Sequence, residues 1–161
     1  MKGTMRILFV EDSEDEAALA VDQLRCYGFD PVFERVETAD AMRTALQRKI
    51  WDIVICDYSM PRFNGRAALE IFNAAHLDIP FICLSGSLGE ERAVEMMRAG
   101  AHDYIIKANM SRLAPSVARE LQAARNRRDY HRMQKAAAHL AALVESSDDA
   151  IISKTLSGVI L

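Results

Sequence analysis

Five residues that could perform chemistry follow short apolar runs of the sequence. Glu11 and Asp12 come directly after one run, Asp57 after a second, Ser85 after a third and Lys107 after a fourth. If these runs are strands of a parallel sheet, their carboxyl ends meet at one edge, where ligands bind in open α/β sheets. Three carboxylates gathered there repel one another unless a cation joins them, and such an oxygen-rich site suits Mg²⁺. A carboxylate nucleophile, a hard divalent metal, a lysine and a hydroxyl are the parts needed to form an acyl phosphate.

The order of the predicted elements supports this arrangement. Five apolar strand candidates alternate with helical patterns and lie at residues 5–10, 31–36, 53–56, 79–84 and 103–106. The third run, Ile53-Val54-Ile55-Cys56, has no polar interruption, which is typical of a strand buried on both faces of a parallel sheet. We therefore predict an α/β fold with a doubly wound, five-stranded parallel sheet and helices on both faces.

Hydroxyl side chains mark several helix starts. Ser13 with Glu16, and Ser87 with Glu90, have the three-residue spacing of a capping box. Thr38 can cap a helix by itself. These caps predict helices that begin shortly after the strands end, which leaves the polar residues at the strand ends in short loops.

The same residues belong to motifs that resemble the receiver domain of two-component response regulators. The resemblance covers residues 5 to about 124 and rests on four features of the sequence. These are the acid pair Glu11-Asp12, the run Asp57-x-x-Met60-Pro61-x-x-x-Gly65, Ser85 followed by Gly86, and Tyr104-x-x-Lys107. It implies a flavodoxin-like receiver fold and a role in two-component signalling.

The resemblance implies that Asp57 accepts a phosphoryl group from a histidine kinase or a phosphotransfer protein. Asp12 and Asp57 would ligate Mg²⁺ together with the backbone carbonyl of Ser59, and Glu11 would act largely through water. Glu11 stands where the family more often has aspartate, which lengthens one arm of the acid pocket without removing its charge.

The resemblance also implies a switch. Lys107 would pair with the phosphoryl group and Ser85 would move to hydrogen-bond it. Tyr104 would then turn inward and reshape the surface around the last strand. Ala108 replaces the proline that usually follows the lysine in this family, so no cis peptide bond is expected there.

Two other interpretations of the acid pocket compete with this one. A receiver-like module could serve only protein interaction and dimerisation, with Asp57 never phosphorylated. Mg²⁺-dependent labelling by a small phosphodonor distinguishes the two. A haloacid-type phosphatase is disfavoured, because that chemistry needs a second aspartate two residues after the nucleophile and position 59 is Ser.

The charge balance changes sign near residue 110. Residues 1–110 carry 12 Lys and Arg against 18 Asp and Glu, whereas residues 111–161 carry 8 against 5. We take this change as a sign of separate structural regions. The predicted regions are a receiver domain over 1–124, a helical coiled-coil linker over 125–145 and the beginning of a truncated PAS-like domain over 146–161.

The linker prediction rests on a helix of about 30 residues. It would have Pro115 at its first position and run to about Glu145 without Gly or Pro. The second half of this helix has an apolar stripe with no domain left to cover it, formed by Tyr130, Met133, Ala137, Leu140 and Val144. The helix therefore either packs back as core or pairs with a second chain. We predict a homodimer through the 114–145 helix. Residues 143–160 resemble the entry to a PAS sensor domain, and proteins of this order commonly continue into a histidine kinase or a cyclic-di-GMP enzyme.

Composition excludes several other classes of protein. The chain is 50% apolar and 27% charged, has no apolar run near the ~18 residues of a membrane helix, and lacks a signal-peptide pattern. Three cysteines without CxxC spacing fit reduced thiols, so we predict a cytoplasmic protein that contacts no membrane. The basic run 125–128 is followed by Asp129 and belongs to no helix-turn-helix unit, so direct nucleic-acid binding is not expected.

Overall fold

The core of the protein is a five-stranded parallel sheet. The computed structural model describes residues 4–87 and 89–156. The strands are β1 (Thr4–Val10), β2 (Asp30–Val36), β3 (Ile53–Asp57), β4 (Phe81–Ser85) and β5 (Asp103–Ile106). Their order in the sheet is β2-β1-β3-β4-β5, and every neighbouring pair is parallel. The predicted doubly wound α/β fold is confirmed.

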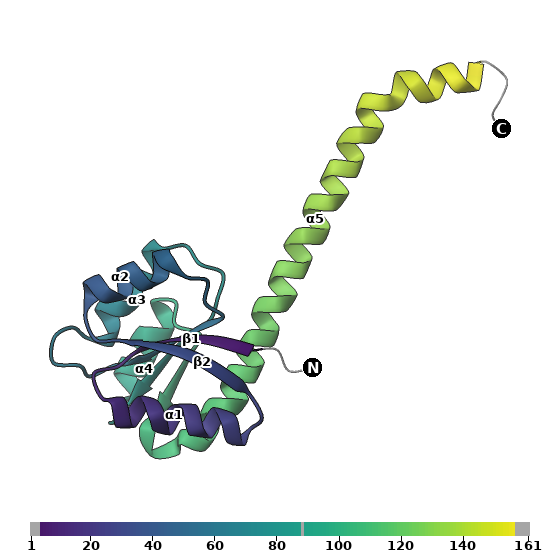
Figure 1. Ribbon diagram of the computed structural model, residues 1–161. Helices are drawn as coiled ribbons and strands as arrows, with labels where there is room; N and C mark the ends of the chain where they lie inside the picture. Colours follow the sequence, from purple (N-terminus) through teal and green to yellow (C-terminus); the bar gives the residue numbers. More distant parts are fainter. Residues whose placement is uncertain (1–3, 88, 157–161) are drawn as a thin grey trace. The chain divides into compact units, whose positions relative to one another are not determined.

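In the described part of the chain, five α-helices and one 3₁₀ helix connect and follow the strands (Figure 1). They are α1 (Glu14–Cys26), α2 (Ala39–Arg48), α3 (Gly65–Ala74), α4 (Glu90–Arg98), the 3₁₀ helix η1 (Lys107–Arg112) and α5 (Leu113–Leu156). Among the described residues, none of these helices combines the length and the apolar character that a membrane crossing requires.

Alternate residues of the central strand enter two separate cores. Ile53 and Ile55 of β3 pack with α1 and the first turns of α5, whereas Val54 and Cys56 pack with α2, α3 and α4. All five residues of β3 are buried. This burial on both faces explains the uninterrupted apolar run. It also places Asp57 at the carboxyl end of a buried strand.

The predicted helix caps are correct at two positions and wrong at a third. Ser13 Oγ accepts from the N–H of Glu16, and Thr38 Oγ1 accepts from that of Ala41. At α4 the capping residue is Gly89, which has no side chain that could cap the helix, and the backbone N–H of Ser87 donates to Ser85 Oγ. The Ser87–Glu90 capping box is therefore wrong.

Helix α5 begins earlier and ends later than predicted. It starts at Leu113 rather than Pro115, because a proline within the first turn removes no helical hydrogen bond. It continues past Glu145 to Leu156, since no Gly or Pro interrupts it. Contacts divide the chain into one unit that ends at Ala124 and a second that begins at Arg125. The last residues of the predicted PAS-like segment, 157–161, lie outside the described residues.

A buried carboxylate anchors the first part of α5 to the sheet. Asp103, at the start of β5, is 9% exposed and accepts a short hydrogen bond from the Ser116 hydroxyl. Its carboxylate also accepts from the backbone N–H of Tyr104 at 2.8 Å and from the Arg119 guanidinium at 2.8 Å. These bonds fix α5 directly beside the strand that leads to Lys107.

We expect Asp103→Ala to lower the free energy of unfolding by about 2–3 kcal/mol, because buried donors lose a charged acceptor. Arg119→Ala should cost at most about 1 kcal/mol, because a largely exposed ion pair contributes little. Urea denaturation of the two variants measures both values. Equal losses would contradict the assignment of Asp103 as the anchor.

Candidate functional site

The carboxyl ends of β1 and β3 bring three carboxylates together. Val10 lies opposite Cys56 in the register of these strands, so the residues that follow them, Glu11 and Asp57, are neighbours. Oxygen atoms of Glu11, Asp12 and Asp57 all lie within 4.8 Å of one another. Glu11 and Asp57 are 3% and 5% exposed, whereas Asp12 is open to solvent. The pocket thus has two buried acids and one accessible from outside.

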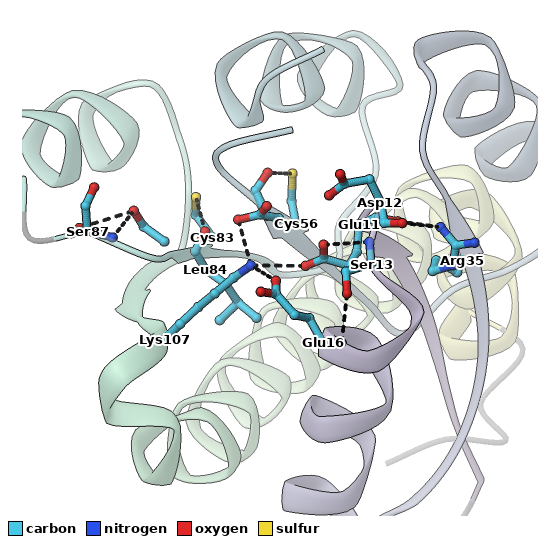
Figure 2. Close-up of polar contacts among 12 residues, drawn as sticks. Glu11, Asp12, Ser13, Glu16, Arg35, Cys56, Cys83, Leu84, Ser87 and Lys107 are labelled. Atoms are coloured by element: carbon cyan, nitrogen blue, oxygen red, sulfur yellow. Dashed lines mark hydrogen bonds and ion pairs between the residues drawn. The ribbon is translucent and has the colours of Figure 1, made fainter. Parts of the chain in front are cut away.

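Lys107 enters this pocket from the end of β5. Its Nζ lies 3.1 Å from Asp57 Oδ1 and 3.3 Å from Glu11 Oε2, and it also forms a short contact with Glu16 of α1. Figure 2 shows the end of the lysine side chain pointing toward the carboxylates of Glu11 and Glu16. The ammonium group therefore compensates part of the negative charge that the strand ends bring together.

The pocket shifts the ionisation of its own groups. Burial raises the pKa of Glu11 to about 7, because the Ser13 N–H and the charge of Lys107 only partly offset lost hydration and the repulsion from other acids. Burial alone would lower the pKa of Lys107, but its contacts with Glu16, Glu11 and Asp57 outweigh this and raise it above the usual value. Lys107 therefore stays charged at any physiological pH.

Ser85 is fully buried at the end of β4, but its hydroxyl faces its own loop. Ser85 Oγ donates to the carbonyl of Ser87 at 3.2 Å and accepts from the N–H of Ser87 at 3.4 Å. The structure therefore places this predicted site residue at the correct edge of the sheet without a bond to the acids. A change in its side-chain torsion would be needed for the hydroxyl to serve a ligand there.

Tyr104 lies inside the protein. It is 8% exposed and belongs to the core on the α2, α3 and α4 side, where its ring makes an edge contact with Tyr58 at 6.4 Å. Tyr58 in turn lies under the guanidinium of Arg92 on α4. The phenol oxygen of Tyr104 is buried and has no hydrogen-bond partner among the described residues. The resemblance implies that Tyr104 turns inward after phosphorylation. In this structure its side chain already lies inside the protein.

The loop after β3 is held in place by close backbone packing. A Cβ on Gly65 would lie 2.9 Å from Tyr58 Cα and 3.3 Å from the carbonyl oxygen of Asp57. The N–H of Gly65 donates to the Tyr58 carbonyl at 2.9 Å. The start of α3 can therefore approach the loop that carries Asp57 and Ser59 only because residue 65 lacks a side chain.

Two residues of the site were not found from the sequence. Arg35 of β2 donates to the carbonyls of Glu11 and Asp12 at 2.9 and 3.2 Å, which fixes the loop after β1. Glu16, predicted only as part of a capping box, contacts Lys107 instead. Arg35 is a charged residue inside a strand candidate, and this feature could have indicated a role for it. No sequence pattern near Glu16 indicates that its partner is Lys107.

The donor set fits a hard divalent cation. Three carboxylates can each direct an oxygen to a common point, and Asp12 is accessible from solvent. Among the described residues, Asp57 Oδ1 is a buried oxygen that accepts no hydrogen bond and has only its ion pair with Lys107. Oxygen ligands of this kind, with room for water, are those that Mg²⁺ prefers.

A match to a family model identifies the family to which the chain belongs. The model of the response regulator receiver domain matches residues 7–118. This chain belongs to the receiver domain family. Such domains serve two-component signalling, accept a phosphoryl group on aspartate, bind Mg²⁺ at an acidic pocket, and interact with histidine kinases or phosphotransfer proteins.

Named relatives agree with this assignment. The transcriptional regulatory protein ZraR of Salmonella typhimurium is 32% identical over 107 residues, which are 66% of this chain and 24% of ZraR. PrrA of Mycobacterium tuberculosis is 33% identical over 102 residues, 63% of this chain and 43% of PrrA. The receiver thus spans less than half the length of these relatives.

Solved structures share the fold. NtrX from Brucella abortus matches with a TM-score of 0.72 and 26% identity, over 83% of this chain and 31% of NtrX. A CheY-like receiver domain protein from Methanospirillum hungatei matches with a TM-score of 0.67 and 22% identity, over 78% of this chain and 99% of its own.

The close packing at Gly65 predicts that a side chain at this position destabilises the receiver. We expect Gly65→Ala to lower the free energy of unfolding by about 1–3 kcal/mol, because the added methyl group displaces the backbone at Tyr58. Mg²⁺ affinity, measured by calorimetry, should fall as the loop after β3 moves. Gly86→Ala is the matched control, since a Cβ there meets nothing within 4 Å. Equal stability of the two variants would contradict the role of Gly65.

Proposed function

We propose that this receiver accepts its phosphoryl group on Asp57. The observation that supports this most directly is the position of Asp57, buried at the end of the central strand with one oxygen 3.1 Å from Lys107 Nζ. An oxygen of this carboxylate attacks the phosphorus atom, and the bond between phosphorus and the donor histidine nitrogen breaks with its electron pair leaving on the nitrogen. The product is an acyl phosphate on Asp57.

Further residues of the pocket complete the proposed site. Asp12, Asp57 and the backbone carbonyl of Ser59 hold Mg²⁺, with Glu11 acting largely through water. When bound, the ion supplies positive charge that stabilises the oxygens of the transferred group. Lys107 donates a hydrogen bond to a phosphoryl oxygen, which a point charge on a flexible side chain does well.

Ser85 and Tyr104 form the proposed switch. Ser85 turns its hydroxyl from Ser87 to the phosphoryl group, which removes two hydrogen bonds within its loop. Tyr104, already inside, is retained there by the rearranged loop, so phosphorylation stabilises one side-chain position rather than creating it. Hydrolysis ends the signal when water attacks phosphorus and the Asp57 carboxylate leaves.

Asp57→Asn is expected to abolish phosphorylation, because an amide is not a nucleophile for this transfer. The test incubates the 161-residue chain with acetyl phosphate, with and without Mg²⁺, and measures intact mass. The wild type should gain one phosphoryl group only with Mg²⁺. The exposed Asp22→Asn of α1 should label like the wild type. Labelling of Asp57→Asn on another aspartate would contradict Asp57 as the acceptor, whereas an unlabelled wild type would favour a module that serves protein interaction alone.

For signal output, we propose that α5 pairs with a second copy as a coiled coil. Tyr130, Met133, Ala137, Leu140 and Val144 follow a 3-4-3-4 spacing. The four large side chains among them are 56–71% exposed. A repeat of this kind buries its side chains when two helices pair. The downstream module is proposed to be PAS-like, on the resemblance of residues 143–160 alone.

A chain that ends at Ala124 should be monomeric, because it lacks these side chains. Light scattering of the shortened and full chains measures their masses. Leu140→Glu in the full chain should also weaken the dimer, since a charge replaces an apolar side chain at the helix interface. Dimers that persist unchanged in the shortened chain would contradict the coiled coil as their cause.

A further inference from the structure

The ammonium group of Lys107 is shared among three carboxylates. Two of them, Glu11 and Asp57, are buried parts of the acid pocket at the strand ends. The third is Glu16, which approaches from the first turn of α1 (Figure 2). Its side chain is 48% exposed, and its oxygens are not among those that converge for a metal. Glu16 is therefore the partner that can leave Lys107 most easily.

Glu16 is available for this contact because another residue has taken its local role. In a capping box the carboxylate at this position would accept from the N–H of Ser13. Here Glu11 Oε1 accepts from that N–H at 3.1 Å. The Ser13 hydroxyl still accepts from the N–H of Glu16, so the backbone cap is intact while the carboxylate of Glu16 is released toward Lys107.

A phosphoryl group on Asp57 changes the competition for Lys107. It replaces the single negative charge of the Asp57 carboxylate with about two negative charges on the phosphoryl oxygens. Lys107 can donate at most three hydrogen bonds, and its present contacts are with Glu11, Asp57 and Glu16. Two of these contacts are hydrogen bonds, to Glu11 and Glu16, and the third is an ion pair with Asp57, so a phosphoryl oxygen on Asp57 competes with Glu11 and Glu16 for the charge of the ammonium group. Because Glu16 is half-exposed, its carboxylate gives up less interaction energy than the buried carboxylates when it leaves Lys107 for water.

We propose that Glu16 limits phosphorylation by competing with the phosphoryl group for Lys107. The proposal rests on the proposed function and adds to it a positioning residue that acts through the lysine. Glu16 takes no part in the bonds that form or break: the Asp57 oxygen bonds to phosphorus, and the donor leaves with the electron pair of the broken bond. What Glu16 sets is how much of the charge of Lys107 is available to the transferred group.

Glu16→Gln should therefore bind a phosphoryl analogue more tightly. We expect the affinity for beryllofluoride at fixed Mg²⁺ to rise about two- to fivefold, the range of a half-exposed ion pair. The rate of labelling by acetyl phosphate should rise by a similar factor. Mg²⁺ affinity without beryllofluoride, measured by calorimetry, should fall slightly, because a negative charge is lost and Lys107 pairs more fully with Asp57.

The matched control is Asp15→Asn, which removes the same charge from the same turn of α1. It should leave the beryllofluoride affinity unchanged within about twofold, because an exposed charge at longer range is screened. Equal effects of Asp15→Asn and Glu16→Gln would overturn the proposal, since they would show a general charge effect. If Glu16→Gln shows a changed fold by circular dichroism, Glu16→Ala serves in its place.

A double-mutant cycle tests the dependence on the lysine. In the Lys107→Ala background, Glu16→Gln should no longer raise the beryllofluoride affinity, because the group for which it competes is absent. An effect of the same size in both backgrounds would overturn the proposal. If the wild type labels on Asp57 with Mg²⁺ but Glu16→Gln behaves like it, only the role of Glu16 fails; an unlabelled wild type overturns the proposed function and this inference together.

Discussion

The site depends on the attraction between the Lys107 ammonium and carboxylates that repel one another. Two unit charges 4 Å apart near a protein surface interact by on the order of 4 kcal/mol. Oxygens of Glu11, Asp12 and Asp57 converge within 4.8 Å, and two of these side chains are buried. Lys107 compensates part of this repulsion, while burial together with the repulsion from the other acids raises the pKa of Glu11. A divalent cation would relieve what remains.

The sheet determines where this charge gathers. Because β1, β3, β4 and β5 are parallel neighbours, the residues that follow them come to one edge of the sheet. The buried strands cannot shift along their register without moving apolar side chains from one core to the other. Close packing at Gly65 and the bonds of Asp103 to α5 then fix the two loops that contain Asp57 and Lys107.

The sequence predicted these features because they depend on short-range patterns. Apolar runs that end in Glu11, Asp57, Ser85 or Lys107 indicate both the strands and the edge at which they meet. What the sequence could not predict are choices between partners distant along the chain. Glu16 and Lys107 are 91 residues apart. The Ser13–Glu16 spacing instead predicts a local partner for the Glu16 carboxylate, the N–H of Ser13. The Ser85 hydroxyl likewise bonds within its own loop, which no residue pattern indicated.

The glutamate at position 11, where the family more often has aspartate, is linked to the contact between Glu16 and Lys107. Glu11 spans two partners, with one carboxylate oxygen on the Ser13 N–H and the other 3.3 Å from Lys107 Nζ. An aspartate, the commoner residue there, is one methylene shorter, so satisfying both partners from the same backbone position would be harder. By satisfying the helix start itself, Glu11 leaves the carboxylate of Glu16 without a local donor. The longer arm of the acid pocket thus supplies Lys107 with a further negative partner and couples the start of α1 to the charge balance around Asp57.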